Sequence, residues 1–218
     1  MPIPVRRARP ASAIPAGRIP FDLNASVMLL HTVQSAEAYV ELEATGRLTA
    51  DPARAHYAEP YAWMHQQMNR RLPTKGHGAI WFWAKMRRDD LISTVRHSPG
   101  EVLLTCRIPR ERVLVSQFDD WHHVLNGSPN VLLLPGESID DYGARYDRIV
   151  DDLWARAEAA GVASRNVWDW PEALRAEVMD TWETIFDPAN YCRTHYWQAT
   201  LHELRASDVV EAVWIEPR

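Results

Sequence analysis

The sequence predicts an α+β fold, with a mixed, mostly antiparallel sheet flanked by helices in a single compact domain. Runs rich in β-branched and aliphatic residues occur at the beginning, middle and end of the chain, and helical patterns occur in two blocks between them. The chain has 218 residues, of which 46% are hydrophobic, so one domain can bury a substantial core. We expect a disordered arm rich in Pro, Ala and Arg over residues 1–25 and the domain over residues 26–218.

The first part of the domain is predicted to be a strand followed by two helices. Residues 26–33, SVMLLHTV, form a short apolar run with β-branched residues, which is typical of a strand. Ser35 can cap the helix that follows, and Gly46 can end it. A second helix is expected over residues 60–72, because four apolar residues recur there on one face. They are Tyr61, Met64, Met68 and Leu72.

The middle of the chain supplies further strands. Residues 79–86, AIWFWAKM, alternate so that Trp81 and Trp83 lie on one side of a strand covered on both faces. Residues 101–109 and 111–118 are rich in aliphatic residues and are separated by a proline. They predict two strands or one bent strand.

Residues 118–127, FDDWHHVLNG, combine two carboxylates with two histidines and raise the question of a metal site, an acid–base pair or packing. Neighbouring side chains on a helix point about 100° apart, so His122 and His123 are poorly placed to bind one ion together. Asp119 and Asp120 suit the first turn of a helix, where carboxylates cap free amide groups and oppose the helix dipole. We interpret the stretch as a helix that ends at the Asn-Gly pair, with one histidine as a candidate pocket wall. Metal-assisted chemistry at these histidines stays open as an alternative.

Two helices and two β-like runs complete the domain. Residues 138–161 carry the N-cap serine, the periodic apolar stripe and the terminal glycine of a long helix. Residues 171–186 repeat this pattern, with proline at the first turn. Residues 195–204 resemble a strand, and residues 207–217 predict a short helical turn before a final strand. The stripe of the long helix contains Ile139, Tyr142, Tyr146, Ile149 and Leu153.

Composition and net charge limit the kinds of binding partner and the cellular location that the sequence predicts. The formal net charge of -5 does not favour nucleic acid or an anionic membrane as a partner. The longest apolar runs are far shorter than the roughly 20 residues of a membrane-spanning helix. Cys106 and Cys192 have no metal-site spacing, and we interpret both as reduced thiols in a cytoplasmic protein. The arginines near the start lack the apolar stretch of a signal peptide.

The motifs that carry common chemistries are not found. The sequence has no GxGxxG, no GxxxxGK[ST] and no GxSxG motif. It therefore does not predict a glycine-rich loop that binds nucleotides or the nucleophile elbow of a hydrolase. The ten tryptophans are unusual in number. Most should pack in the core, but paired tryptophans can also form flat walls for a stacked ring such as nicotinamide or adenine.

The two ends of the domain carry a further set of polar residues. If the strands near both ends lie side by side, they bring His31, Gln198, His202 and Glu203 together. Such a set can hold an amide by hydrogen bonds and place a carboxylate against developing positive charge. The alternative is that Glu203 is a solvated residue at a strand end.

Six phrases in the sequence, in this order, resemble a bacterial family described as domain of unknown function 3841. The resemblance extends from about residue 27 to residue 215. It implies kinship and no particular biochemical activity. The phrases are LLHTVQSAEAYVELEATGRL, EPYAWMHQQM, IWFW, LVSQFDDWHHVLN, DTWETIFD and YWQATLHEL.

The order of elements is also similar to that of ADP-ribosyltransferase-like domains. Those begin with a strand bearing His or Arg near Thr, continue through a helix ending in glycine, and finish with a strand carrying Gln or Glu before an apolar closing strand. The resemblance implies that Glu203 and His31 are catalytic, with Glu203 stabilising an oxocarbenium-like ribose as nicotinamide leaves. Thr200 stands where many such enzymes carry the catalytic glutamate. The residues implied to bind the cofactor are Thr32, Trp81, Trp83 and Gln198.

The resemblance implies NAD as a co-substrate, no metal, and a small-molecule or protein acceptor that it does not identify. The function expected from the sequence is therefore an NAD-using ADP-ribosyltransferase-like enzyme. The alternative is a non-catalytic domain on the same scaffold that binds a small molecule or another protein.

Overall fold

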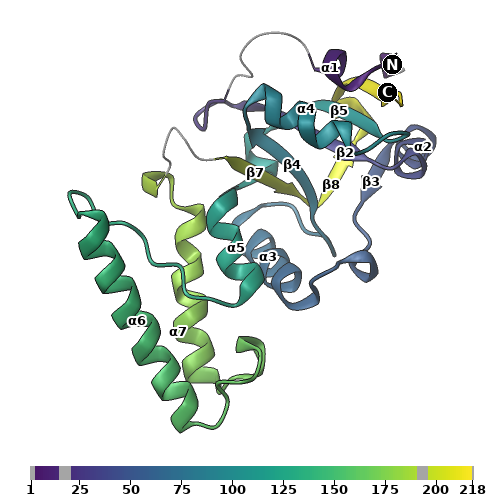
Figure 1. Cartoon of the computed structure of the whole chain (residues 1–218). Helices are drawn as coiled ribbons and strands as arrows, with labels where there is room; N and C mark the ends of the chain where they lie inside the picture. Colours follow the sequence, from purple (N-terminus) through teal and green to yellow (C-terminus); the bar gives the residue numbers. More distant parts are fainter. Residues whose placement is uncertain (1–2, 15–20, 191–195, 218) are drawn as a thin grey trace. The chain divides into compact units, whose positions relative to one another are not determined.

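The computed structural model of the protein describes residues 3–14, 21–190 and 196–217 (Figure 1). The contacts of the chain group it into two compact units, Met1–Ser116 with Tyr196–Arg218 and Gln117–His195. The described residues contain both helices and a mixed sheet, so the predicted α+β class is confirmed. The domain boundaries at residues 1–25 and 26–218 stay a prediction.

A seven-stranded sheet organises the described part of the first unit, in the order β1-β9-β5-β2-β4-β7-β6. Strand β1 runs parallel to β9, whereas β9 with β5, β5 with β2, β2 with β4 and β4 with β7 are antiparallel. The predicted mixed, mostly antiparallel sheet is therefore confirmed. Its strands are β1 Val5–Ala8, β2 Val27–Gln34, β4 Ile80–Lys85, β5 Val102–Pro109, β6 Leu114–Gln117, β7 Trp197–Leu201 and β9 Val209–Ile215.

The pairing of β2 differs on its two sides. On one side β2 pairs with β5 along its whole length, from Val27 to Gln34. On the other side His31 and Trp83 are the one registered pair between β2 and β4 in the described residues. Strands β2 and β4 are thus joined over a short stretch only, which leaves room for a cavity between the end of β2 and the start of β4.

Helices cover both faces of the sheet in this unit. Leu91 and Val95 of α4 form a buried cluster with Val213 of β9. Tyr39 of α2 meets the neighbouring residue Trp214 edge to face, with ring centroids 5.6 Å apart. Successive strand residues point to opposite faces, so α4 and α2 lie on opposite faces of the sheet. The helices of this unit are α1 Pro10–Ala13, α2 Ala36–Thr45, α3 Ala58–Arg71 and α4 Arg88–Arg96.

The N-terminal segment departs from the disordered arm that its composition predicts. Residues 5–8 form β1 on the edge of the sheet, and residues 10–13 form α1. Arg6 donates a 2.6 Å hydrogen bond to Glu211 of β9, and its guanidinium also donates to the carbonyl of Ala13 at 2.9 Å. A prediction from composition considers only the apolar surface that a segment can bury by itself. This segment is instead stabilised by pairing with a strand about 200 residues away in the sequence.

The predicted helices and strands from residue 26 to residue 86 are found with small shifts at their ends. Ser35 caps α2 by accepting from the backbone N–H of Ala38, and Gly46 ends it at φ 77°. Helix α4 was not predicted from the sequence; only Leu91, Ile92 and Val95 in it are apolar, and the other six residues are polar or charged. Strand β3, Arg47–Thr49, is also missed, because its partner β8, Glu203–Arg205, is far away in the sequence.

The two apolar runs on either side of Pro109 are separate strands. Strand β5 lies inside the sheet, whereas β6 lies at its edge beside β7. Near the end of the chain, the run expected as one strand divides at His202 into β7 and β8. The predicted helical turn and final strand are confirmed as a 3-10 helix, Ala206–Asp208, followed by β9.

The second unit is mainly helical. Helices α6 and α7 lie side by side (Figure 1), and Arg156 of α6 donates two hydrogen bonds of 2.7 and 2.6 Å to Glu177 of α7. The indole N–H of Trp182 in α7 donates to the carbonyl of Ser128 at 2.7 Å. The helices are α5 Phe118–Asn126, α6 Ile139–Ala159 and α7 Glu172–Trp182, the last continued by a 3-10 helix over Glu183–Phe186.

The long helix is confirmed, but its predicted buried stripe is only partly right. Leu153 is buried, whereas Ile139 and Ile149 are 71% and 40% exposed. The contacts of α6 with α7 involve its C-terminal half, where Arg156 lies. Periodicity identifies the apolar face of a helix, but it does not show along how much of that face a neighbour packs.

The FDDWHHVLNG stretch is a helix, as predicted. Gln117, and not an aspartate, provides the N-cap, since its side-chain oxygen accepts from the N–H of Asp120 at 2.5 Å. Trp121 and Val124 are buried, and Gly127 ends the helix at φ 61°. The carboxylates lie in the first turn, where the helix dipole favours them.

Candidate functional site

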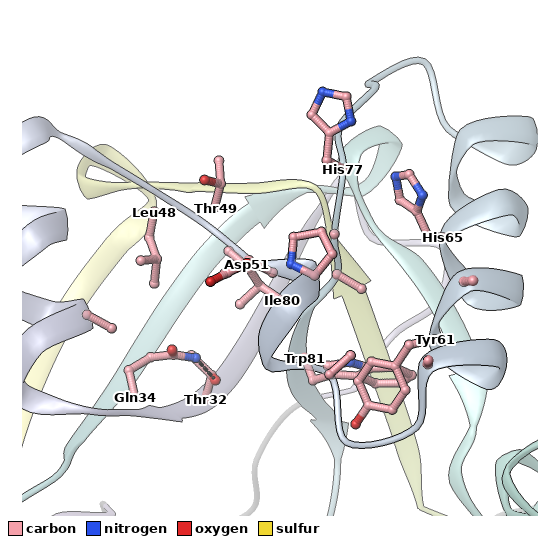
Figure 2. Close-up of a pocket in the computed structure, with 18 of the residues that line it drawn as sticks. Thr32, Gln34, Leu48, Thr49, Asp51, Tyr61, His65, His77, Ile80 and Trp81 are labelled. Atoms are coloured by element: carbon pink, nitrogen blue, oxygen red, sulfur yellow. Dashed lines mark hydrogen bonds between the residues drawn. The ribbon is translucent and has the colours of Figure 1, made fainter.

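A cavity of about 600 Å³ lies in the first unit where β2 and β4 separate (Figure 2). It is lined by the end of β2, the loop that follows β3, the first half of α3 and the start of β4. Ala38, Ala58 and Ala62 present small side chains to it, which helps to keep the space open. The volume falls in the range of about 300–1000 Å³ that is typical of small-molecule sites.

One wall of the cavity is aromatic. The rings of Tyr61 in α3 and Trp81 in β4 lie 5.5 Å apart at an angle of 59° (Figure 2). Tyr57 stacks on Tyr61 at 6.5 Å and 25°. Burial, with a smaller contribution from Tyr57, raises the pKa of Tyr61 above its ordinary value, so its phenol stays neutral at neutral pH. This wall offers π-faces on which a flat ring can stack.

The other side of the cavity is polar. The side-chain N–H of Gln34 donates to the hydroxyl oxygen of Thr32 at 2.8 Å, and both groups lie across from the aromatic pair in Figure 2. This bond uses one N–H of the amide and one lone pair of the hydroxyl. The remaining donor and acceptor positions of both groups can serve a ligand.

Asp51 supplies the carboxylate of the cavity. Among the described residues that line the cavity, it is the one acidic side chain. Its Oδ1 accepts from the backbone N–H of Ala53 at 2.9 Å, which caps the 3-10 helix Pro52–Arg54. The cap fixes one oxygen, and the exposed carboxylate can still interact with positive charge in the cavity.

Two histidines also line the cavity. Figure 2 shows His65 on α3 and His77 in the loop before β4. A ring nitrogen of His65, Nε2, lies 2.5 Å from the carbonyl oxygen of Gly76 and 3.0 Å from the side-chain nitrogen of Asn69. These contacts anchor the loop of residues 73–79 to α3.

Three of the residues predicted for the site lie in one row across the sheet. His31 is registered with Trp83, and Trp83 is registered with Gln198. Thr105 extends the row on the other side of His31, and its hydroxyl lies 3.2 Å from His31 Nδ1. Directly paired residues share a face, so this row presents its side chains together. Trp81 is two residues from Trp83 on the same face and also lines the cavity.

The row contains polar atoms that are buried without partners. His31 Nε2 and Gln198 Nε2 have no hydrogen-bond partner among the described residues. Burial lowers the pKa of His31 to about 4, so its imidazole is neutral at pH 7. An unsatisfied buried donor or acceptor costs about 1–3 kcal/mol, and such atoms are uncommon enough to require an explanation.

Glu203 lies apart from the cavity. Its carboxylate accepts a 2.9 Å hydrogen bond from Arg205, and it lines a second, smaller cavity of about 200 Å³. The chain leaves the main sheet at His202 to pair as β8 with β3, and this turn separates Glu203 from Thr32 and Trp81. Periodicity within one strand cannot predict such a change of sheet.

The structure therefore brings together part of the predicted site. Thr32 and Trp81 line the large cavity, whereas His31, Trp83 and Gln198 form a row across β2, β4 and β7 and are not among its lining residues. The residues that the sequence patterns missed are Gln34, Asp51, Tyr61 and His65. Tyr61 was visible only as part of an apolar helix face, and Asp51 lies in a loop with no recognisable motif.

The paired histidines of α5 have separate partners. His122 Nδ1 lies 3.0 Å from the carbonyl oxygen of Phe118, and His123 Nδ1 lies 3.0 Å from the hydroxyl of Ser128. Burial is the main cause that lowers the pKa of His123. Neither histidine lines the 600 Å³ cavity. In residues 3–14, 21–190 and 196–217, no group of three or more His, Cys, Asp or Glu side chains is arranged to hold a metal ion.

Cys106 is a buried free thiol, and burial, with a smaller effect of Asp208, raises its pKa. Cys192 lies outside the described residues. None of the helices in the described part of the chain has the length and apolar character needed to cross a bilayer. The cytoplasmic location stays a prediction.

Comparison with protein families matches residues 29–210 to a domain of unknown function (DUF3841). No curated protein and no solved structure matches the chain significantly. The matched region includes β2, the cavity, the cross-strand row and all of the second unit. Because the match covers most of the sequence, the chain belongs to the DUF3841 family.

Proposed function

We propose that this protein binds NAD in the 600 Å³ cavity and transfers ADP-ribose from it to an acceptor. The observation that carries the proposal is the pairing of an aromatic wall, Tyr61 and Trp81, with a polar pair, Thr32 and Gln34, across a cavity of suitable size. A flat ring can stack on the wall while amide or hydroxyl groups of the ligand bond to the polar side. The order of motifs shared with ADP-ribosyltransferase-like domains favours NAD among ligands with flat rings.

The reaction breaks the bond between the ribose anomeric carbon and the nicotinamide nitrogen, and the electron pair leaves with nicotinamide. A nucleophile of the acceptor then bonds to the anomeric carbon and loses a proton. Positive charge develops on the ribose, and a nearby carboxylate stabilises it. Asp51 lines the cavity and is the candidate for this role, which the sequence resemblance assigns to Glu203. His31 and Gln198, which the resemblance also assigns to the site, lie in the row that contains Trp83 and outside the cavity lining, so the proposed step uses neither of them.

Titration of the purified protein with NAD in a calorimeter tests binding. Loss of the Trp81 ring in Trp81→Ala should weaken binding by about 5- to 150-fold, the equivalent of about 1–3 kcal/mol for one stacked base. Trp154→Ala is the control, since Trp154 is partly exposed in the second unit. If the parent protein does not bind NAD, or if both variants bind it as the parent does, the proposal fails.

Nicotinamide release, followed by chromatography, tests catalysis. Asp51→Asn should retain the helix cap, because Asn caps as well as Asp, and should lose most of the release. Asp187→Asn is a matched control, because Asp187 also precedes a Pro-Ala pair and accepts from the N–H of Ala189 at 2.8 Å. Equal release by both variants would remove Asp51 from the mechanism. A Glu203→Gln variant examines the assignment made from the sequence resemblance.

A second candidate is a non-catalytic domain that binds a small molecule in the same cavity. The position of Glu203, held by Arg205 and away from the cavity, favours this candidate. It predicts that Trp81→Ala weakens ligand binding while the parent protein releases no nicotinamide above the rate in buffer. Saturable NAD binding, together with nicotinamide release faster than in buffer, would favour the enzyme over the non-catalytic domain.

A further inference from the structure

A second cavity, of about 200 Å³, lies beside the first within the same unit. Its lining is strongly polar and mostly basic. It comprises Thr74, Lys75, Arg112, His202, Glu203 and Arg205. The volume is several times the share of about 30 Å³ that one water molecule takes in the liquid, so the cavity has room for a small polyatomic anion.

Of the three cationic side chains that line the second cavity, two are in ion pairs within the described part of the chain and Lys75 is not. Arg112 pairs with Asp208 at 2.9 Å, and Arg205 pairs with Glu203 at 2.9 Å. Lys75 bonds to the carbonyl oxygens of Asn69 and Leu72, the latter at 3.3 Å, and to no carboxylate in the described residues. These two bonds use two of the three ammonium hydrogens, and the third is available to a ligand. Lys75 is exposed, and together with the two ion pairs it gives this group of side chains a net charge of +1.

His202 adds a buried polar atom to the same cavity. The residue is 4% exposed, and its Nε2 has no hydrogen-bond partner among the described residues. Its Nδ1 lies 3.0 Å from the hydroxyl of Thr74, which leaves Nε2 for another group. A Cβ added at Gly76 would lie 2.9 Å from His202 Cβ, so the loop that carries Lys75 packs closely on the imidazole.

The two cavities meet at a pair of histidines. The rings of His65, which lines the large cavity, and His202, which lines the small one, are in edge-to-face contact with centroids 5.7 Å apart. The loop of residues 73–79 contributes to both, with Thr74 and Lys75 in the small cavity and His77 in the large one.

We infer that the second cavity is a phosphoryl-binding site, in which Lys75 and the guanidinium of Arg112 hold the oxygens of the anion and the imidazole of His202 donates from Nε2. Arg112 uses two of its five N–H donors in the bonds to Asp208 and to the carbonyl of Glu203, so others can reach a ligand. Lysine and arginine donors match the charge and geometry of a phosphoryl group. Desolvation first, and then the charges of His65 and Lys75, lower the pKa of His202 to about 4. Its imidazole is thus neutral at pH 7, when one ring nitrogen donates and the other accepts. The site goes beyond the proposed function, because it does not require that NAD bind in the first cavity.

Calorimetric titration of the full chain with inorganic pyrophosphate at pH 7 tests the site. We expect saturable binding that weakens with salt, and a loss of about 10- to 150-fold in Lys75→Met, as for a hydrogen bond to a charged group. Lys85→Met is the control, because Lys85 lies over the ring of Phe21 and is the second of only two lysines in the chain. Lys75→Arg should retain most of the affinity.

Lys75 also bonds to the C-terminal end of α3, so a second measurement avoids dependence on a variant that fails to fold. Incorporation of lysine labelled with ¹³C at Cε leaves the ammonium groups unmodified and gives only two lysine signals. Pyrophosphate should shift the Lys75 signal and leave that of Lys85 in place. Absence of saturable binding, or equal shifts of both lysine signals, would overturn the inference.

Competition identifies the source of the phosphoryl group. If the group belongs to a nucleotide in the large cavity, pyrophosphate competes with NAD, and Lys75→Met weakens NAD binding but not adenosine binding. If it belongs to a separate phosphorylated molecule, pyrophosphate and NAD bind together. Pyrophosphate binding without NAD binding would refute the proposed function alone, and NAD binding without pyrophosphate binding would refute the second site alone.

Discussion

The ion pair between Arg112 and Asp208 is predicted to be a major determinant of the stability of the first unit. Their side chains are 10% and 8% exposed, and Arg112 donates a 2.9 Å hydrogen bond to Asp208 Oδ1. Asp208 Oδ2 also accepts from the backbone N–H of Arg205 at 2.9 Å. Asp208→Asn keeps the shape of the side chain but leaves the guanidinium charge buried without its partner.

The expected cost is about 3–5 kcal/mol, the usual effect of removing one partner from a buried ion pair. For a chain of this size each kcal/mol lowers the melting temperature by about 2–4 °C, so a loss of at least about 6 °C is expected. Urea denaturation followed by circular dichroism, together with thermal melting, measures both quantities. The ligand should be absent in these experiments, so that binding does not add to stability.

A double variant separates the cost of the unpaired charge from the loss of packing. Arg112→Met with Asp208→Asn removes both charges and should be more stable than the sum of the single losses predicts, by about 1 kcal/mol or more. If Asp208→Asn stays within 1 kcal/mol of the parent, or if the two losses simply add, the two residues are not coupled and the reasoning is refuted.

Two further predictions concern a glycine and a histidine. Gly127→Ala should destabilise the second unit by at least about 2 kcal/mol, since φ is +61° and the new Cβ would lie 2.6 Å from Val167 Cγ1. Gly136→Ala is the control, because φ there is +79° and the new Cβ would have no atom within 4 Å, so only the backbone strain of about 1 kcal/mol is expected. Urea denaturation measures both losses. Because burial lowers the pKa of His31 from 6.5 to about 4, the unfolded chain binds a proton more readily, and stability falls as the pH drops from 7 to 5. The share of His31 is about 2 kcal/mol, so His31→Gln should show a smaller loss between these pH values, and an unchanged loss would contradict its burial as a neutral group.

Local patterns predicted those elements that are stabilised by their own residues. The helix from Ser35 to Gly46 has both of its caps in the sequence, and the strand of residues 80–85 has a clear alternation around its tryptophans. His31, Trp83 and Gln198 were predicted as members of one site, and sheet register does place them in a row. The sequence alone could not supply that register, because it depends on which strands become neighbours.

Other features depend on contacts between distant segments. Arg6 is held by Glu211, so residues 5–8 of the segment that composition predicts to be disordered form a strand. Glu203 follows β7 by only two residues, yet it pairs with β3 in the small sheet and faces the basic cavity. These positions depend on pairing between strands that are distant in the sequence, which the periodicity of a single segment does not predict.

The sequence by itself determined the α+β class, most of the helices and strands, and the membership of the family, because caps, alternation and apolar periodicity act over a few residues. The tertiary structure decided where β2 and β4 separate, and therefore that Tyr61 and Asp51 share a cavity with Thr32 and Trp81. It also decided that Lys75 and His202 meet in a second cavity. A site assembled from loops and strand ends depends on the path of the whole chain, and its residues become neighbours only when the sheet has formed.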